Sequence, residues 1–209
     1  MYITILIDNE SWIKPYGVKL YNEIIKLEHT CNFVSKHSDV SGGDILFMLG
    51  CTKIFNNLHL NKHNIVIHES KLPKGKGWSP LTYQILEGNN EIPITLFEAV
   101  KEMDAGDIYI TDYISLTGYE LHDEIKNKQG LKTIELALRF INDINKLKKV
   151  KQIGESIFYK RRTPIDSELD INKTISEQFN LLRVCSNDLY PAFFIINNNK
   201  YYLKIYKDK

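Results

Sequence analysis

Short apolar runs alternate with amphipathic segments over the first half of the chain. Residues 2–7, YITILI, form a continuous apolar run with β-branched side chains, which is typical of a strand buried on both faces. Further runs of this kind lie at residues 31–34, 44–49 and 64–68. After the first run, Leu20, Ile24 and Leu27 have the spacing of one helix face. The alternation predicts an α/β fold with a mostly parallel, doubly wound sheet.

The pattern continues with a second helix and two late strands. Ser79 can cap a helix that has Pro80 in its first turn and ends before Gly88. Residues 92–99 and 107–116 predict an antiparallel pair of strands at the far side of the sheet. The strongest amphipathic segment, residues 132–144, predicts a helix that closes the core or forms a homodimer interface. Its apolar side consists of Ile134, Leu136, Leu138, Ile141 and Ile144.

A change in composition near residue 150 predicts the end of the core. The stretch KLKKVKQIGESIFYKRRTP is basic and irregular, and we interpret it as a solvated linker rather than a tRNA-binding surface, because acidic residues dilute it. We therefore expect a core at residues 1–150 and a small α+β extension at residues 151–209. The extension has one helix candidate, residues 175–184, and two strands around the turn NNNK, which predict a β-hairpin.

Composition narrows the possible classes of protein. The 209 residues include 27 Lys and Arg against 26 Asp and Glu, so the formal net charge of +1 favours no nucleic-acid or membrane partner. Cys31, Cys51 and Cys185 have no paired spacing, which argues against disulfides and a metal site. The apolar start is too short for a signal peptide or a membrane span, which favours a cytoplasmic protein.

The stretch HNIVIHESKLPKGKGWSP carries the first chemical signal. His68 ends a predicted parallel strand, and ligands of open α/β sheets bind beyond the carboxyl ends of such strands. The loop that follows has glycine amides, Lys74 and Lys76 that could hold an anion. It is not a P-loop, because Gly-Trp follows the Gly-Lys pair.

The second signal is a pair of carboxylates in the link between the two late strands. Asp104 and Asp107 flank Ala105-Gly106. Such a turn is ordinarily solvated. A carboxylate beside an imidazole in a cleft, however, can take a proton from an attacking nucleophile.

These two motifs together resemble the formyltransferase family, which passes the formyl group of 10-formyltetrahydrofolate to an amine. The family motif has a histidine, a serine two residues later, Leu-Pro, a basic-Gly step and a helix that begins with proline, followed later by a strand threonine and an Asp-small-Gly-Asp turn. The matching residues here are His68, Ser70, Leu72, Pro73, Lys76, Gly77, Pro80, Thr95, Asp104, Gly106 and Asp107. The stretches DNESWIKPYG, FMLGCTKI, PLTYQILEG and YPAFF extend the likeness to the amino-sugar branch over nearly the whole chain.

The resemblance implies a Rossmann-like core and a specific site. Within the family, the chain resembles most the small sugar-nucleotide N-formyltransferases of the pseudaminic acid pathway. These act on a UDP-linked amino sugar, UDP-4-amino-4,6-dideoxy-N-acetyl-altrosamine, with folate as formyl donor and no metal. The implied catalytic residues are His68, Asp104 and Asn64; the formyl donor would contact Phe47, Leu49, Gly50, Ser70 and Asp107; and the sugar nucleotide would contact Asn9, Ser11, Trp12 and Lys76.

One departure from the family pattern leaves alternatives open. The family has an oxyanion-binding Asn two residues before the histidine, where this chain has Val66, and Asn64 lies a further step of about 7 Å back on the same strand face. The alternatives are a glycinamide ribonucleotide formyltransferase, an aminoacyl formyltransferase such as the methionyl-tRNA enzyme, and a degenerate member that binds nucleotide sugar or folate without catalysis. The first lacks support because DNESWIKPYG is not glycine-rich; for the second, we expect a longer carboxyl-terminal domain.

Overall fold

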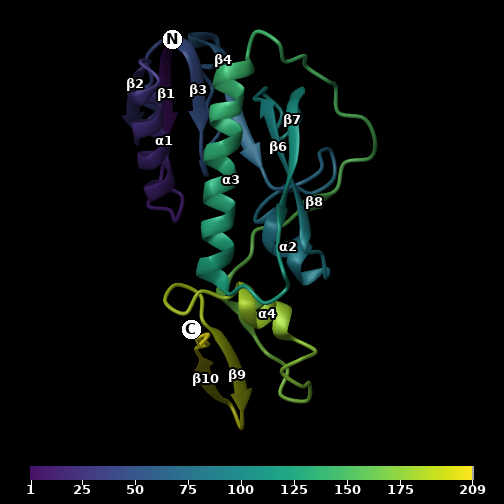
Figure 1. The fold of residues 1–209 in the computed structure, drawn as a ribbon. Coiled ribbons are helices and arrows are strands. Elements are labelled where there is room, and N and C mark those ends of the chain that lie inside the picture. The colour runs from purple at the N-terminus through teal and green to yellow at the C-terminus, as the bar shows by residue number, and fades with distance from the viewer. Residues whose placement is uncertain (209) are drawn as a thin grey trace.

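A six-stranded sheet forms the centre of the computed structural model, which describes residues 1–208 (Figure 1). In the order β2-β1-β3-β4-β6-β7, its strands are Thr30–Val34, Tyr2–Leu6, Gly43–Met48, Asn61–His68, Glu91–Glu98 and Ile108–Ser115. The first four strands are parallel, whereas β6 is antiparallel to both β4 and β7. This confirms the predicted α/β fold with its mainly parallel sheet and late antiparallel pair.

The helices of the core pack on one face of this sheet. They are α1 (Lys14–Lys26), α2 (Pro80–Leu86) and α3 (His122–Asp143). Side chains from the first four strands meet Leu20 and Ile24 of α1 and Phe140 of α3 in one apolar cluster. Burial of this cluster is the main stabilising contribution to the core, since apolar burial contributes about 25 cal/mol per Å².

The second face carries short turns instead of helices. The 3₁₀ turns η1 (His37–Asp39) and η2 (Leu58–Leu60) lie in the connections from β2 to β3 and from β3 to β4. A smaller apolar cluster that includes Leu46 and Phe55 lies under them. The prediction of a doubly wound sheet therefore does not hold in full: both faces are covered, but only one by helices.

The alternation of side chains along β4 assigns each residue to one of these faces. Ile65 and Ile67 pack into the helix-covered cluster, whereas Val66 packs against the second cluster. Because successive side chains of a strand point to opposite faces, Asn64 and His68 share the face of Val66. The candidate chemistry at the end of β4 therefore lies on the face without long helices.

Helix α3 begins about ten residues earlier than the sequence pattern predicted. Its buried side includes Gln129, Gly130 and Thr133, which are not apolar and hide the helical period. Gly130 lies against Tyr16 of α1, whose ring atoms would be 2.4 Å from an added Cβ. Close contact between the two helices thus replaces the large apolar side chains that a sequence pattern can detect.

The carboxyl-terminal part lies beyond one end of the sheet (Figure 1). It contains η3 (Pro164–Ser167), α4 (Phe179–Val184) and a hairpin of β9 (Ala192–Ile196) and β10 (Asn199–Leu203). Asn197 and Asn198, with φ of 47° and 61°, form the hairpin turn, as asparagine in a primed turn can. The predicted helix and hairpin are confirmed, although α4 is shorter than expected; the boundary near residue 150 stays a prediction.

A buried ion pair connects this extension to the core. Arg183 of α4 is 1% exposed, donates to the side chain of Asn90 at 2.9 Å and lies 3.7 Å from Glu120. Glu120 also accepts from Lys128 at 2.7 Å. Burial would raise the pKa of Glu120, but hydrogen bonds from Lys128 and the Thr117 backbone outweigh it and lower the pKa to about 2.

Among residues 1–208, no helix has the length and apolar character to cross a lipid bilayer.

Candidate functional site

His68 lies at the carboxyl end of β4, opposite Thr95 of β6. The residue is 8% exposed, and its Nε2 lies 2.8 Å from the carbonyl oxygen of Gly75. A carbonyl can only accept, so Nε2 carries a proton and donates it to Gly75. The loop that follows β4 therefore folds back and fixes the tautomer of its own strand-end histidine.

Asp104 approaches His68 from the loop between β6 and β7. Glu98 N donates to Asp107 O across the base of this loop at 2.9 Å, and Ala99 N joins the start of the loop to β4 by donating to Asn64 O at 2.6 Å. A Cβ on Gly106 would lie 1.6 Å from Glu98 O, so only glycine permits this path of the backbone. Asp104 itself has φ of +49°, an uncommon value for a residue other than glycine.

The imidazole and the carboxylate lie close together. Asp104 Oδ2 is 3.9 Å from His68 Nε2, and the side chains are only 13% and 10% exposed. The same oxygen accepts the backbone N–H of Gly77 at 2.9 Å. At 3.9 Å the two side chains form an ion pair when the imidazole is protonated, but not a hydrogen bond. The predicted convergence agrees with this geometry; the catalytic roles stay predictions.

Asn64 is directed elsewhere. Its Nδ2 donates to Leu58 O of η2 at 2.9 Å, and the residue is 4% exposed. It lies four residues before His68 on an extended strand, which corresponds to about 13 Å. The structure therefore does not bring Asn64 to the imidazole, and it gives no support to the idea that Asn64 supplies the missing oxyanion donor.

The residues suggested for the formyl donor divide into two groups. Phe47 is fully buried against Phe140 of α3, and Leu49 is 3% exposed in the same cluster. Their side chains form part of the core and are not available to a ligand, because Phe47 of β3 and Leu49, just beyond its end, both face the helices. That this segment binds the donor stays a prediction, and the resemblance could not show which of its side chains point outward.

The other donor-site residues lie nearer to the loops. Gly50 is exposed, has φ of +59° and accepts the side chain of Asn9 at 2.9 Å. Ser70 is 2% exposed and its hydroxyl has no hydrogen-bond partner among the described residues, while its carbonyl accepts Thr95 Oγ1 at 2.7 Å. Asp107 is partly exposed beside Gly106. These three remain candidates for contact with a donor.

Asp8, which follows the first strand, holds the loop after β3 in place. Its carboxylate accepts the backbone N–H groups of Thr52 and Lys53 at 2.8 and 3.0 Å and lies 3.1 Å from His37 Nε2. Burial would raise the pKa of Asp8, but these bonds and one from Asn9 outweigh it and lower the pKa. The loop from Gly50 to Lys53 is thus fixed to the end of β1.

The segment proposed to contact a sugar nucleotide follows β1 at the same edge of the sheet. Asn9, Ser11 and Trp12 are all partly exposed. The Trp12 ring lies 4.4 Å from Nζ of Lys126 in α3, a cation–π geometry that the sequence did not indicate. Burial lowers the pKa of Lys126 to about 8, although the charge of Glu69, the residue after His68, acts in the opposite direction.

Lys76 is more buried than a phosphate-binding lysine on an open loop would be. It is 7% exposed, and its Nζ lies 5.7 Å from the centre of the Phe158 ring. Its backbone belongs to the two-residue strand β5 (Lys76–Gly77), which pairs with β8 (Phe158–Tyr159). Its ammonium group thus contacts this ring and not a carboxylate of the described residues.

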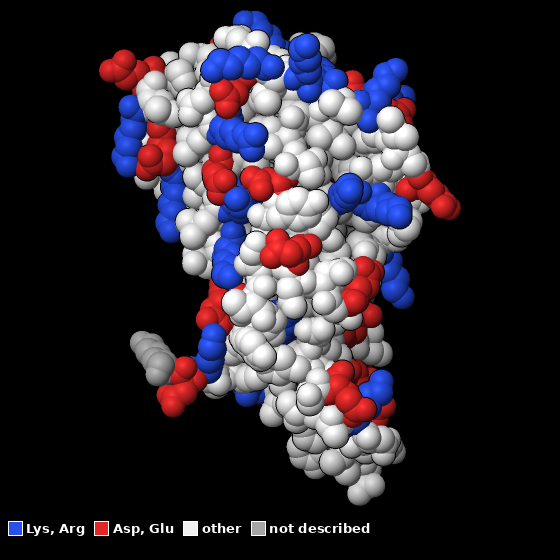
Figure 2. All heavy atoms as spheres, turned by 45° about the vertical axis from the view of Figure 1, so that its right-hand side comes forward, with Lys and Arg blue, Asp and Glu red and all other residues white. Residues whose placement is uncertain are grey.

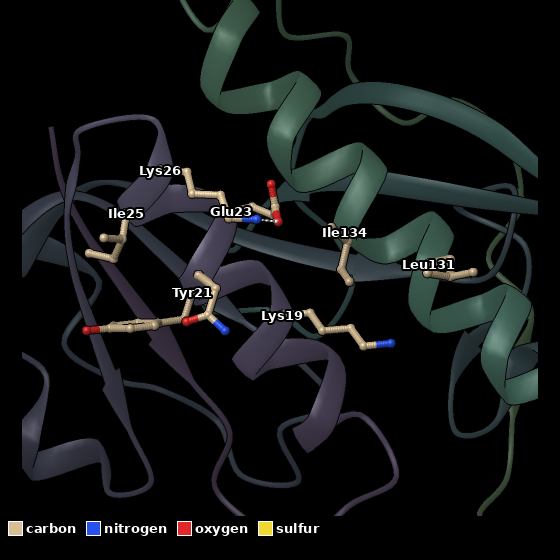
Figure 3. A pocket seen from close by; sticks show the side chains of 8 residues that line it. Lys19, Tyr21, Glu23, Ile25, Lys26, Leu131 and Ile134 are labelled. Atoms are coloured by element: carbon tan, nitrogen blue, oxygen red, sulfur yellow. Dashed lines mark hydrogen bonds and ion pairs between the residues drawn. The ribbon is translucent and has the colours of Figure 1, made fainter.

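A hollow of about 640 Å³ lies away from these residues, between α1 and α3 (Figure 3). Its lining includes Ile25, Leu131 and Ile134, together with the ion pair of Lys26 and Glu23. It contains no residue of the site around His68, so we do not assign substrate to it.

Among the described residues, no group of three or more His, Cys, Asp or Glu side chains could hold a metal ion.

Comparison with known proteins relates the chain to formyltransferases. It is 28% identical over 205 residues to a methionyl-tRNA formyltransferase of Mycoplasma mycoides, which covers 94% of this chain and 60% of the relative. A second such enzyme, from Mycoplasma capricolum, is 31% identical over 144 residues, covering 68% of this chain and 45% of that protein. The chain thus spans about half of the length of the relatives it matches. No protein-family model matches it.

Solved structures share the fold over almost the entire chain. A methionyl-tRNA formyltransferase from Clostridium thermocellum superposes with a TM-score of 0.80 at 19% identity, over 96% of this chain and 90% of that one. A 4-N formyltransferase from Francisella tularensis gives 0.73 at 22% identity, over 100% and 98%. HypX from Aquifex aeolicus in complex with tetrahydrofolic acid gives 0.73 at 15%, over 95% of this chain and 36% of HypX. The chain therefore has the formyltransferase fold.

Proposed function

We propose that this protein is an N-formyltransferase that moves the formyl group of 10-formyltetrahydrofolate to the amine of a nucleotide-linked amino sugar. The observation that carries the proposal is the 3.9 Å approach of His68 and Asp104 at the carboxyl edge of a sheet with the formyltransferase fold. An imidazole and a carboxylate in such a position can move a proton and stabilise a developing charge. The complex of HypX with tetrahydrofolic acid supports folate as the carrier.

In this reaction the unprotonated amine attacks the formyl carbon and forms a tetrahedral intermediate with an oxyanion. His68 donates from Nε2 to the oxyanion after exchanging its bond to Gly75 for one to the intermediate; one such donor typically contributes about 3 kcal/mol. The proton that the amine loses passes, directly or through water, to the second ring nitrogen of His68, and the carboxylate of Asp104 stabilises the imidazolium that results. That proton then passes to the folate nitrogen as its bond to the formyl carbon breaks, the oxyanion returns to a carbonyl, and the amide product forms.

Charge distribution favours a small acceptor over tRNA. On the face in Figure 2, Lys and Arg side chains are interspersed with Asp and Glu over most of the surface. The formal net charge is only +1. RNA binding relies on a continuous basic surface, because each phosphate contact contributes electrostatically.

For the acceptor we propose a UDP-linked 4-amino-4,6-dideoxy sugar of the pseudaminic acid pathway, bound near Trp12 and Lys76. An aromatic ring and a buried lysine suit a nucleotide base and a diphosphate, respectively. The rival acceptor is methionyl-tRNA, which the names of the sequence relatives favour.

A competition between acceptors tests the proposal. The protein is incubated with 10-formyltetrahydrofolate and, in parallel, a UDP-linked 4-amino sugar, its dTDP-linked counterpart, glycinamide ribonucleotide and methionyl-tRNA. Mass spectrometry detects the replacement of an amine hydrogen by a formyl group. We expect formylation of a nucleotide sugar and none of methionyl-tRNA. Formylation of methionyl-tRNA alone would refute the sugar assignment, and binding of folate without turnover of any acceptor would refute catalysis.

A further inference from the structure

The chain between α3 and the extension crosses both loops of the candidate site. We call residues 149–160 the strap; it descends beside the sheet from the far end of α3 (Figure 1). Val150 exchanges two backbone hydrogen bonds with Ile108, both at 2.8 Å, at the start of β7. Eight and nine residues later, Phe158 and Tyr159 pair in parallel with Lys76 and Gly77. The strap is therefore fixed at two points, with the site between them.

Between these points, Gln152 holds the loop of Asp104 through its backbone. Its Nε2 donates to the carbonyl oxygens of Asp104 at 2.9 Å and Gly106 at 2.8 Å. An amide nitrogen has two hydrogens, so both bonds can form at once. They fix the direction of the two carbonyls on either side of Ala105, where Asp104 has its positive φ. The side chain of Asp104 leaves this turn toward His68.

The strap also holds the opposite side of the site. Lys76 N donates to Ile157 O at 2.8 Å and Trp78 N to Tyr159 O at 3.1 Å. Gly77, between them, donates instead to Asp104 Oδ2 at 2.9 Å. A Cβ on Gly77 would lie 2.5 Å from Tyr159 O, so the close pairing requires glycine here. One segment thus sets the position of the Gly77 donor and of the carboxylate that accepts from it.

We propose that Gln152 is a positioning residue for Asp104: through its two bonds to the 104–106 turn, it sets the distance of the carboxylate from His68. The inference rests on the proposed function, because it assigns to the strap a part in the formyl transfer. The bonding of Gln152 itself favours this role over a purely structural one. Its Oε1 is buried and has no hydrogen-bond partner among the described residues, so the side chain is held only through the turn.

The first test compares Gln152→Leu with Lys151→Ala in the formyl-transfer assay. Leucine fills a similar volume but cannot donate, whereas Lys151 is an exposed neighbour on the same strap. We expect Gln152→Leu to lower kcat by about 10- to 100-fold, as small displacements of a reacting group do, with KM for both substrates within about threefold. Lys151→Ala should retain the kcat of the unmodified protein.

The second test needs no turnover. Hydrogen exchange of three amides, followed by NMR, reports on Asp104 and on the strap separately, because Gly77 N bonds to Asp104 while Lys76 N and Trp78 N bond to the strap. In Gln152→Leu, we expect the Gly77 amide to exchange at least about fivefold faster, with Lys76 and Trp78 unchanged.

The outcomes separate the two proposals. If the unmodified protein formylates no acceptor, the proposed function fails, and the exchange of Gly77 alone decides whether Gln152 positions Asp104. An unchanged Gly77 amide would overturn the inference, whatever happens to kcat. Equal acceleration at Lys76, Gly77 and Trp78 would also overturn it, since Gln152 would then hold the strap in place rather than Asp104.

Discussion

Replacement of Asp104 by asparagine tests the electrostatic part of the mechanism. Asparagine has nearly the same shape as aspartate, and its Oδ1 can still accept the Gly77 amide that now bonds to Asp104 at 2.9 Å. What the variant loses is the negative charge 3.9 Å from His68 Nε2. The position of the 104–106 turn should be unchanged, because Gln152 holds that turn through backbone carbonyls.

The size of the effect follows from the distance and the burial. Two unit charges 3.9 Å apart interact by about 4 kcal/mol at an effective dielectric constant of about 20. The side chains retain 13% and 10% exposure, and the Gly77 bond already offsets part of the charge, so the interaction contributes about 2–3 kcal/mol. If the protonated imidazole forms in the transition state, kcat should fall about 30- to 150-fold.

The assay is initial-rate formyl transfer with the acceptor identified by mass spectrometry, and Glu102→Gln is the matched control. Glu102 is an exposed carboxylate in the same loop, so its loss changes the net charge equally without touching His68. We expect near-normal kcat for the control and an unchanged thermal midpoint for both variants. A kcat of Asp104→Asn within about threefold of the unmodified enzyme would refute the idea that this charge stabilises the imidazole.

Three further changes probe the frame of the site. Gly106→Ala should abolish formyl transfer and lower the free energy of unfolding by more than about 2 kcal/mol, since its Cβ would overlap Glu98 O; urea unfolding measures this, and a stable, active variant would contradict the glycine argument. Lys76→Met should raise KM for the nucleotide sugar about tenfold with little change in kcat, and an unchanged KM would remove Lys76 from the phosphate site. Glu120→Gln should lower the free energy of unfolding by about 3 kcal/mol at neutral pH, because the pKa of Glu120 is lowered from 4.5 to about 2 in the folded protein. A group whose pKa is lowered by folding stabilises the folded state at pH values above its pKa in the unfolded chain. The difference in unfolding free energy between the two proteins should therefore shrink as the pH falls from 4.5 toward 2. A difference that grows in acid would show the opposite linkage.

Sequence patterns predicted those parts of the fold in which a buried face is apolar. The strand at residues 2–7 and the antiparallel pair that became β6 and β7 were visible because their buried side chains are aliphatic. The first half of α3 was not, because Gln129 bonds Lys126 on its own helix, and Thr133 bonds the Gln129 carbonyl. Polar side chains that form hydrogen bonds within their own helix can be buried, and the sequence then shows no apolar residue at every helical repeat.

The candidate site was predictable only where one residue carries its own signal. His68 at a strand end and Asp104 before a small-Gly-Asp turn were both visible as motifs. Gln152 was not, because it lies in an irregular basic segment and acts through contacts 46 and 48 residues away in the chain. Phe47 and Leu49 were assigned to the donor site because their segment resembles a ligand loop, although the side chains of both, at the end of β3 and just after it, are buried in the core.

In the proposed mechanism, Val66 leaves the pair of His68 and Asp104 without a second donor from β4. Val66 and Ala99, the first residue of the Asp104 loop, both pack against the second apolar cluster, so the position at which the resembled family has its amide carries a hydrocarbon side chain. Asn64 donates to Leu58 O and lies about 13 Å back along β4. On this face of the strand, His68 is then the side chain that can donate to an oxyanion, because its hydrogen bond to Gly75 O keeps the proton on Nε2. Since no second donor of β4 shares the charge, the stabilisation that Asp104 gives to the imidazole should contribute more to the rate here than in an enzyme that has the asparagine.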